Sequence, residues 1–499
     1  MRGVVDSLAQ IKPSKQKGKT KMKKRLKLML CLLLVAVMLI TVACNNSNAG
    51  PSTKETDGGD VTETEDVGLE DIDMDGADFT IAWSNPYNHN EVAPLEEDAL
   101  VGSIDEAVWS RNMLVEDLTG AHIVGYHVSD WQQMLIEIEK ECLSQEGVFD
   151  AYCGSIYYQF VASISNYLYD LKTLTKLNTE NEWWDQGLNE MYSFQSKNQY
   201  YIGGDINYCD DYGQNVLFFN IKLLEDSSME MPYDLVRNGD WTVDAMYQYV
   251  QNFSKDNGDD VWDKNDTYGA VLSAGELSFM ICGFGTTMIR CTGPGELSLN
   301  EERKVADYVG NVFQKFFAYG NPDVIIAERD MSEGVYELFQ NGKALFQASS
   351  VTSILEFRHK MEDDFGILPY PKFNEDQEGY YCAFNTPWAT AYSIPSVSPD
   401  AETVGLILDY MGSVSHDTVY KTAIEVNAMS KLLRDENTAE MLDLIFKSKI
   451  YDLGMWPTAI YAATNTMVYQ GFNSWASTIA NVKDKVNAEY YEVPNYYTD

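Results

Sequence analysis

The sequence predicts an α/β protein in which the strands of a parallel sheet alternate with helices. Three short apolar runs alternate with two stretches of helical periodicity, in the order 78–83, 104–119, 122–127, 131–144 and 148–154. This order is typical of a parallel sheet with helices packed on its faces. Ligands bind such sheets beyond the carboxyl ends of the strands, so the loops that follow Trp83 and Asp150 form the predicted binding edge.

The second half of the chain predicts a further α/β part. Apolar runs predict strands at 216–220, 344–348 and 364–368. Helical periodicity predicts helices at 300–318, 333–343 and 401–414. Thr242 is the expected N-cap of another helix, because its hydroxyl can accept a hydrogen bond from the first turn. The segments 200–205 and 380–394 are expected to connect the two parts.

Residues 22–44 (MKKRLKLMLCLLLVAVMLITVAC) have the composition of a secretory signal peptide. Four basic side chains within residues 23–27 precede an almost wholly apolar run over 28–40. Small or β-branched residues then lead to Cys44, and a cysteine at the cleavage point indicates a lipoprotein signal. The apolar run is short for a membrane span, although an N-terminal anchor that is never cleaved is the alternative.

The chain is strongly acidic, with 76 Asp and Glu residues against 36 Lys and Arg residues. Residues 1–43 hold 10 of the basic and 1 of the acidic residues, so the remaining 456 residues have a formal net charge of −49. Such a surface repels nucleic acid and anionic lipid, which makes both poor partners. The 32 Tyr and 10 Trp residues offer flat, half-polar faces that suit sugars, although core packing uses such residues too.

The eight cysteines form no CxxC pair and no Cys/His cluster with metal-ligand spacing. Cys31 lies in the predicted signal peptide, and Cys44 is the predicted lipid attachment site. Six further cysteines are scattered, at Cys142, Cys153, Cys209, Cys282, Cys291 and Cys382. The sequence leaves open whether these six form disulfides or stay buried and reduced.

Several motifs behind the signal resemble those of one family in their order and spacing. They are VFDAYCG at 148–154, YYIGGDINYCDDYGQNVLFFNIKLLED at 200–226, GDWTVDAMYQYV at 239–250, FQNGKALFQ at 339–347, DFGILPYPKF at 364–373 and AYSIPSVSPDAETVGLILDYM at 391–411. With the lipobox-like Cys44, in which Thr41 stands where relatives usually carry Leu, this order is similar to that of the extracellular solute-binding lipoproteins of bacterial ABC importers. The resemblance is to the carbohydrate-type class (family 1), which includes maltose-binding protein.

The resemblance implies a two-lobe, periplasmic-binding-protein-like fold of type II, with a hinge between the lobes and a helix-rich C-terminal region. It implies a monomer anchored by lipid on the extracellular face of the cell membrane, which delivers a small solute to ABC permease subunits. The implied signal peptide is 1–43, which includes an upstream extension before the expected start at Met22. Residues 44–75 are the implied lipidated Cys44 and a flexible acidic linker. Lobe 1 is then 76–205 with about 390–430, and lobe 2 is 206–389 with about 431–499.

The resemblance also implies which residues bind the solute. In the first lobe these are the loops after the first and third strands and the first crossover, with Ser84, Asn85, Tyr87, Tyr152, Ser155, Tyr157, Asp205, Asp210 and Tyr212. The remaining expected ligand residues are Ser349, Trp388, Tyr392, Trp456 and Trp475. Ser349 and Ser350 stand where relatives commonly carry an aromatic. A core-packing role is the alternative for each aromatic, and a turn-capping role is the alternative for Asp205.

The loop 255–269 resembles a calcium site. Oxygen ligands at alternating positions suit a hard divalent cation, and this loop offers them at Asp256, Asp259, Asp263 and Asp266. The EF-hand pattern needs Gly at its sixth position, whereas Gly258 is third here, so a solvated acidic turn is the alternative. No other cofactor is expected.

Catalysis has little support in the sequence. The five histidines are scattered, and no HExxH, GxSxG or GxxxxGK[ST] motif is present. Carboxylates are so abundant that counting them does not exclude a glycosidase pair. The favoured hypothesis is a solute-binding protein with no chemistry of its own, and the alternative is a secreted, surface-anchored glycan-active enzyme or adhesin.

Overall fold

The structure is a computed structural model that describes residues 69–84, 91–92, 103–327, 329–331, 334–383, 389–424, 436–456, 458–472 and 474–497. Contacts divide the chain into two units, residues 1–65 and 66–499, and every described residue belongs to the second unit. The predicted signal peptide and Cys44 lie outside the described residues.

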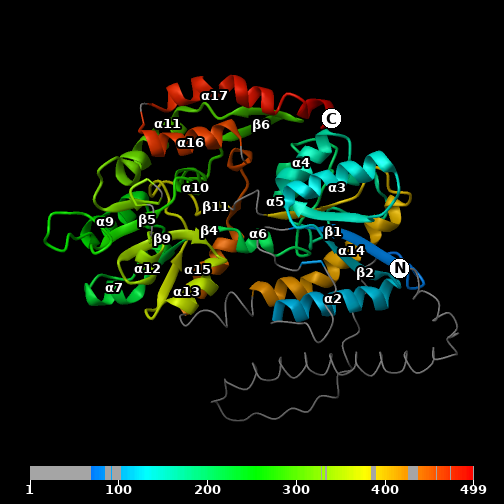
Figure 1. Cartoon of the computed structure of the whole chain (residues 1–499), viewed down its shortest axis with the longest axis horizontal. Helices are drawn as coiled ribbons and strands as arrows, with labels where there is room; N and C mark the ends of the chain where they lie inside the picture. Colours follow the sequence, from blue (N-terminus) through cyan, green and yellow to red (C-terminus); the bar gives the residue numbers. More distant parts are fainter. Residues whose placement is uncertain are drawn as a thin grey trace, which may run out of the picture. The chain divides into compact units, whose positions relative to one another are not determined.

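Four strands form the first sheet, in the order β12–β3–β1–β2 (Figure 1). Strands β1 (Asp78–Trp83), β2 (His122–His127) and β3 (Ala151–Ser155) are parallel, and β1 and β2 have the predicted bounds. Strand β12 (Thr390–Ser393) pairs antiparallel with β3. The sheet is therefore mixed, because a strand from far along the chain pairs at its edge. The order of the first three strands predicted a purely parallel sheet and did not reveal this strand.

Five strands form the second sheet, in the order β10–β4–β9–β5–β8. Their bounds are β4 (Asn215–Asn220), β5 (Tyr268–Leu272), β8 (Val324–Ile326), β9 (Ala344–Ser350) and β10 (Phe365–Leu368). β5 is parallel to β8 and β9, and β4 is antiparallel to β9 and β10. Two small sheets accompany it and pair β6 (Ile289–Gly293) with β7 (Glu296–Leu299) and β11 (Cys382–Ala383) with β13 (Lys449–Ile450).

The α-helices are α2 (Ser103–Thr119), α3 (Trp131–Ser144), α4 (Ile156–Ile164), α5 (Gln186–Tyr192), α6 (Cys209–Tyr212), α7 (Ile221–Asp226), α8 (Tyr233–Asn238), α9 (Val243–Phe253), α10 (Glu276–Gly283), α11 (Arg303–Val312), α12 (Glu337–Gln340), α13 (Ser353–Lys360), α14 (Ala401–Ser415), α15 (Glu436–Lys447), α16 (Ala459–Gln470), α17 (Trp475–Glu489) and α18 (Val493–Tyr496). π-Helical turns continue α11 and α14, at Phe313–Phe317 and His416–Tyr420.

Local signals set several helix ends. Thr242 caps α9, and its hydroxyl accepts a hydrogen bond from the Ala245 N–H at 3.3 Å, as predicted. The predicted helix at 333–343 shrinks to α12, Glu337–Gln340. Gly334 and Gly342 flank α12 with φ of 72° and 67°, a conformation that a right-handed helix cannot include.

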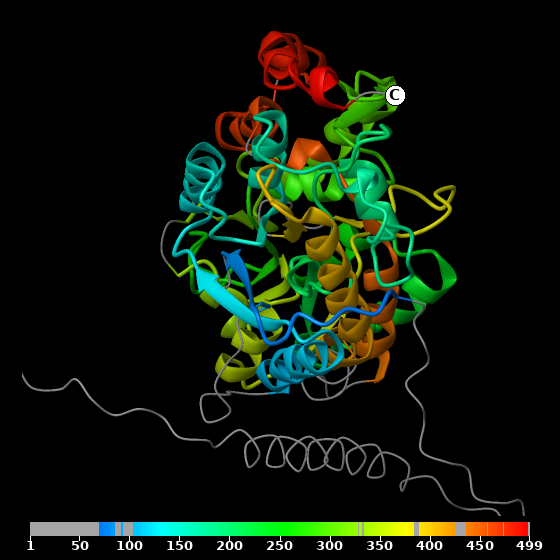
Figure 2. The same ribbon diagram turned by 90° about the vertical axis from the view of Figure 1, so that its right-hand side faces the viewer.

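Helices pack on both sheets, and the C-terminal helices contact both parts. α14 lies along α2 beside the first sheet (Figures 1 and 2). α18 contacts α4 of the first part, whereas α16 and α17 contact α10 and β7 of the second. One hydrophobic core accordingly includes Tyr152 from the first sheet, Leu272 from the second and Trp456 from the C-terminal region.

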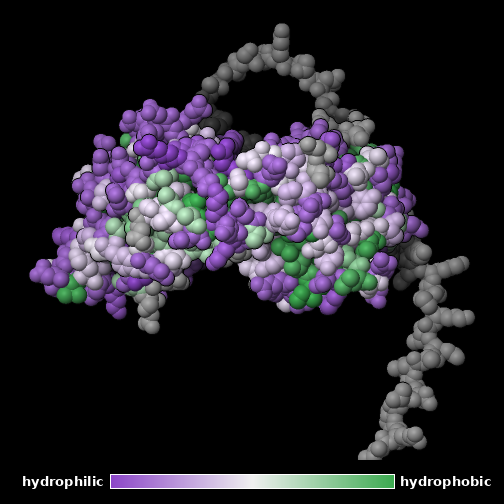
Figure 3. All heavy atoms as spheres, turned by 90° about the horizontal axis from the view of Figure 1, so that it is seen from above, coloured by the Kyte–Doolittle hydropathy of each residue, from purple (hydrophilic) through white to green (hydrophobic). Residues whose placement is uncertain are grey.

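The surface in Figure 3 is mostly hydrophilic, in keeping with the acidic excess of the chain. Apolar side chains gather toward the lower right of that view, over the part built on the first sheet. This part exposes Tyr126, Ile136, Leu143 and Val148. Among the described helices, none combines the length and the apolar character that a membrane crossing requires.

The six cysteines left open by the sequence are all free thiols in the structure. Cys142 and Cys291 are half-buried, and the other four are buried. Burial raises the pKa of the buried Cys153, Cys209 and Cys282 thiols well above the usual range, which keeps them protonated and unreactive.

Gly204→Ala is expected to destabilise the protein by at least about 2 kcal/mol. A Cβ at this position would lie 2.2 Å from the Trp183 carbonyl oxygen and 2.7 Å from the Trp184 Cα, and backbone atoms cannot move aside. The matched control is Gly203→Ala, whose Cβ would meet side-chain atoms alone, the Leu188 methyl groups at 3.4 Å and Asn207 Oδ1 at 3.7 Å. Urea unfolding of both variants checks the difference, and equal stabilities would contradict the close approach.

Candidate functional site

Two described passages carry the chain between the sheets. The first passage, residues 203–214, begins after Ile202, which forms an isolated bridge with Tyr392, and ends at β4. The second passage, residues 369–389, runs from the end of β10 to the start of β12, and its residues 384–388 lie outside the described part. The segment 200–205, which was expected to connect the two parts, forms only single bridges, through Ile202 and Gly204.

Both passages meet the sheets at the carboxyl ends of the parallel strands. β12 begins at Thr390, which pairs with Ser155, the last residue of β3. β4 begins at Asn215, which pairs with Ser350, the last residue of β9. We call these two places the first edge and the second edge. Ligands of open α/β sheets bind at such edges, so polar side chains at both edges define the candidate site.

A buried carboxylate, Glu91, joins the first passage to the first edge. Its Oε1 accepts hydrogen bonds from the backbone N–H groups of Tyr208 at 2.9 Å and Cys209 at 3.0 Å. Its Oε2 accepts from the Thr390 hydroxyl at 2.7 Å, and Thr390 Oγ1 accepts from Asn207 Nδ2 at 2.9 Å. Burial raises the pKa of Glu91 despite these donors.

A second buried carboxyl group, Glu276, lies at the second edge, where α10 begins after β5. It accepts hydrogen bonds from Ser273 Oγ at 3.1 Å, from Asn215 Nδ2 at 3.5 Å and from the Tyr370 hydroxyl. Burial raises the pKa of Glu276 to about 7, so near neutral pH this group is both a proton donor and an acceptor. Such a group can bind a hydroxyl in either direction.

Some of the buried polar atoms without partners lie on the first passage and at its neighbouring edge. Ser155 Oγ, Asn207 Oδ1 and both amide atoms of Gln214 are buried and have no hydrogen-bond partner among the described residues. A buried polar group without a partner costs about 1–3 kcal/mol. Gln214 is wholly buried and is followed directly by Asn215, so its amide lies where the first passage enters the second edge. These atoms mark where a polar ligand would gain most.

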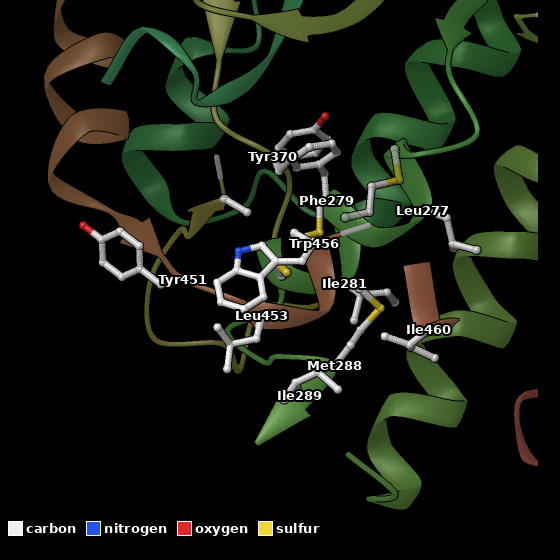
Figure 4. Close-up of a cluster of buried hydrophobic side chains, with 14 of the residues drawn as sticks. Leu277, Phe279, Ile281, Met288, Ile289, Tyr370, Tyr451, Leu453, Trp456 and Ile460 are labelled. Carbon is white, nitrogen blue, oxygen red and sulfur yellow. The ribbon is translucent and has the colours of Figure 1, made fainter. Parts of the chain in front are cut away.

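Trp456, an expected stacking surface, is instead part of the core. Its side chain is 0% exposed and packs among apolar residues from α10, β6 and the C-terminal region (Figure 4). Its ring stacks on Tyr192 at 5.8 Å and contacts Phe160 at 4.6 Å. In Figure 4 the hydroxyl of Tyr451 points away from it. Because both ring faces are covered by protein, the expectation of an open sugar platform at Trp456 is corrected.

The other described aromatics of the expected set also pack inside. Tyr152 on β3 and Tyr392 on β12 are 0% exposed, and Trp475 at the start of α17 is 4% exposed. These three are corrected to core residues, because each is buried within a hydrophobic core. Tyr157 on α4 is half-buried, and its ring meets the edge of Trp456 at 5.5 Å. Among the described aromatics of the expected set, Tyr157 therefore keeps a partly accessible ring.

The expected polar residues fall in two places. Ser84 and Ser155 lie at the first edge and Ser349 lies near the second, where its hydroxyl meets Ser353 Oγ at 2.6 Å. Tyr212 donates to the Ala423 carbonyl at 2.9 Å. Asp205 and Asp210 instead form ion pairs, with His416 at 2.5 Å and Lys449 at 2.9 Å. No turn-capping bond of the Asp205 carboxylate is found among the described contacts.

Three expected ligand residues, Asn85, Tyr87 and Trp388, lie outside the described residues. The expected calcium loop is described, and its aspartates bond to the backbone of the loop itself. Asp266 accepts from the Asn257 and Asp263 N–H groups at 2.8 and 2.6 Å, and Asp256 accepts from the Gly258 N–H at 2.5 Å. In the described part of the chain no group of three or more His, Cys, Asp or Glu side chains is arranged to hold a metal. Calcium binding here stays a prediction.

Comparison with known proteins gives similarity at the level of structure. No family model matches the sequence, and no curated protein matches it. An ABC substrate-binding protein from Listeria monocytogenes, solved with cycloalternan, is 11% identical with a TM-score of 0.54, over 83% of this chain and 99% of that one. The GacH receptor of Streptomyces glaucescens, solved unliganded and with acarbose, is 12% identical with a TM-score of 0.53, over 84% and 99%. UspC of Mycobacterium tuberculosis is 11% identical with a TM-score of 0.54, over 82% and 99%.

The chain has the two-lobe fold of ABC-importer solute-binding proteins. The predicted fold class is therefore confirmed. In this solute-binding fold the first edge belongs to the lobe built on the first sheet, and the second edge to the lobe built on the second sheet. Nearly the whole length of each similar chain is matched, so the likeness covers both lobes together.

The sequence analysis did not predict four polar residues of the candidate site, which are Glu91, Gln214, Asn215 and Glu276. Gln214 and Asn215 stand directly before the predicted strand 216–220, so the signal was the polar pair at a strand start. Glu276 follows the run YGAVL at 268–272, which was not recognised as a strand. Glu91 carried no signal, because only the fold brings it to Thr390.

Glu276→Gln is expected to change how the stability of the protein depends on pH. The folded-state pKa of about 7 exceeds the ordinary 4.5, so the folded protein binds this proton more readily than the unfolded chain between those values. The stability from this group is present below about pH 4.5 and is lost as pH rises through about 7. Glutamine does not titrate, so at pH 8 the variant should be more stable than the wild type by an amount on the order of 2 kcal/mol.

Urea unfolding at pH 5, 6, 7 and 8 measures this difference. The control is Glu146→Gln, which removes an exposed carboxylate of the first lobe and should leave the pH slope unchanged. If the Glu276→Gln protein lost stability with rising pH as steeply as the wild type, Glu276 would not carry a raised pKa.

Proposed function

We propose that the protein is an extracellular, lipid-anchored solute-binding protein that captures a sugar or oligosaccharide between its lobes and delivers it to an ABC importer. One observation carries the proposal. In this chain the two sheets are joined by passages that begin and end at the carboxyl edges, and the fold matches nearly the full length of the similar solute-binding proteins. A ligand at these edges would touch both lobes at once, which is what couples binding to hinge closure.

The polar groups at the edges support a polyhydroxyl ligand. Sugars present hydroxyl groups that both donate and accept hydrogen bonds, and amides, hydroxyls and carboxyl groups match them. The amide of Gln214 and Ser155 Oγ are buried without partners among the described residues, and Glu276 can donate or accept. Tyr157 offers a ring of the first lobe for a CH face.

The similar structures point in the same direction. The protein from Listeria monocytogenes was solved with cycloalternan, and the GacH receptor with acarbose. These proteins are binders, which supports a role without chemistry for this chain. The ligand of this chain need not be either compound, because identity to these proteins is only 11–12%.

The anchor is part of the proposal. A diacylglyceryl group on the sulfur of Cys44 would hold the protein at the outer face of the membrane, and the acidic, Gly- and Ser-containing segment that follows would act as a tether. Capture near the membrane would raise the encounter rate with permease subunits by keeping the receptor close to them.

Gln214→Ala is expected to weaken sugar binding about tenfold or more. Thermal-shift screening of residues 66–499 against mono- and oligosaccharides first identifies a stabilising sugar, since a ligand at 100 times its Kd stabilises by about 2.7 kcal/mol. Calorimetric titration with that sugar then compares the wild type with Gln214→Ala, which removes an amide that has no described partner of its own. One bound sugar per chain, recovered chemically intact, is the expected result.

The matched control for this titration is Gln132→Ala, which removes an exposed amide on α3 and should leave Kd unchanged. A sugar that is cleaved during the experiment would contradict a pure binding role. Equal Kd values for Gln214→Ala and Gln132→Ala would show that the solute does not reach the first passage.

Cys44→Ser is expected to move the protein from the membrane fraction to the soluble extracellular fraction of the expressing bacterium. Serine has no thiol to carry the lipid, whereas the secretion signal before it is unchanged. Fractionation and mass measurement of the mature N-terminus check the result, with Cys142→Ser as the control that keeps the anchor. A Cys44→Ser protein that stays in the membrane would indicate an uncleaved anchor instead of a lipid.

A further inference from the structure

A pocket of about 350 Å³ lies where the first passage meets β13 and the segment before α5. Five charged residues of its lining form the junction cluster, which is Asp185, Asp205, Asp210, Asp211 and Lys449. The proposed solute site does not use this cluster, although the sequence analysis expected Asp205 and Asp210 to bind the solute.

Lys449 is the centre of the junction cluster. Its Nζ lies 2.7 Å from Asp211 Oδ1, 2.9 Å from Asp210 Oδ2 and 3.5 Å from Asp185 Oδ2. The Tyr451 hydroxyl also donates to Asp185. The side chains of Asp210 and Asp211 are only 3% and 4% exposed, so these ion pairs are shielded from salt and water.

Asp205 forms the second ion pair of the cluster. Its Oδ2 lies 2.5 Å from Nδ1 of His416, whose ring stacks on Tyr420 with centroids 6.3 Å apart. The bond to Asp205 raises the pKa of His416. Glu182 and Lys447 complete the charged lining of the pocket, and Tyr420 lines it too.

Negative charge is in excess at this place. Four carboxyl groups face one buried ammonium and one half-exposed imidazole, and Asp210 Oδ1 is buried without a partner among the described residues. Burial, with the charge of Asp210 adding to it, raises the pKa of Asp211 to about 7. Burial likewise raises the pKa of Asp205 to about 6. Burial opposes ionisation of Asp185 too, but the charge of Lys449 holds the pKa of that group below its usual range.

The residues of the junction cluster belong to three different segments of the chain. Asp185 precedes α5, whereas Asp205, Asp210 and Asp211 lie on the first passage. Lys449 begins β13, which pairs with β11 on the second passage. Lys449 also follows α15, which packs against β10 of the second sheet, whereas His416 continues α14, which packs against α2 of the first part. A rotation of one lobe relative to the other would therefore change the distance between the two ion pairs of the cluster.

We propose that the junction cluster is a proton-operated latch on lobe movement. Proton uptake by the assembled cluster favours the lobe arrangement of this structure, and proton release favours an arrangement in which the segments separate. The inference rests on the proposed function, because a hinge that moves for solute capture is what the latch would bias. Its test uses no solute, so failure of the latch is distinguishable from failure of the sugar proposal.

The sign follows from the direction of the pKa shifts. Asp205 and Asp211 bind protons more tightly when the cluster is assembled, and return toward ordinary values when water reaches them. The assembled arrangement is thus favoured below about pH 6 and loses that advantage as pH rises through about 7. The ratio of the two arrangements should change on the order of tenfold between pH 5.5 and 8.

Distance measurement between spin labels, by double electron–electron resonance, tests the latch on the full chain in detergent without solute. Labels are attached at Ser144→Cys on α3 and Ser227→Cys after α7, both exposed. Cys31, Cys44 and the half-buried Cys142 and Cys291 are replaced by serine. The wild-type distance distribution should shift between pH 5.5 and 8 with a midpoint between about 6 and 7.

Asp211→Asn mimics the protonated carboxyl of one of the two titrating groups and should reduce the shift between the two pH values. Asp205→Asn is the second variant if Asp211→Asn fails to fold, and it should reduce the shift. The control Glu378→Gln removes an exposed carboxylate and should shift like the wild type. A wild-type distribution that is the same at pH 5.5 and 8, or a shift of wild-type size in both Asp variants, overturns the proposal.

Discussion

The arrangement of the molecule depends on where the chain crosses between its sheets. β4 and β12 each begin opposite the last residue of a neighbouring strand, so both passages leave and enter at carboxyl edges. This pairing places the ends of β3, β5 and β9 beside the passages, and with them Ser155, Glu276 and Ser350. Some of the buried polar atoms that have no partner among the described residues, including the amide of Gln214, lie at the same place. A ligand there would replace missing hydrogen bonds and join the lobes in one step.

Local patterns in the sequence predicted local structure well. The bounds of β1, β2 and α3 and the Thr242 cap were confirmed, because a periodic apolar face or a capping hydroxyl acts within a few residues. The antiparallel place of β12 was missed, since pairing between residues more than 200 positions apart leaves no local pattern. The two-lobe fold itself came from the order of motifs along the whole chain.

Site residues were harder to predict for a physical reason. An aromatic side chain suits a sugar face and a protein core equally well, and only packing decides between them. Trp456 lies between Tyr192 and Phe160 and is buried, whereas Tyr157 keeps a partly open face. Acidic residues divide similarly. Asp205 and Asp210 form ion pairs at the junction, and Glu276, which no motif indicated, lies at the second edge.

Hydrogen–deuterium exchange, measured with and without a stabilising sugar, tests the central claim most directly. A solute held between the lobes should slow exchange at both edges together, in peptides that cover 153–157, 205–216, 271–277 and 349–352. Protection confined to one lobe, or absent from both edges while the sugar binds, would show that the solute site lies elsewhere on the molecule.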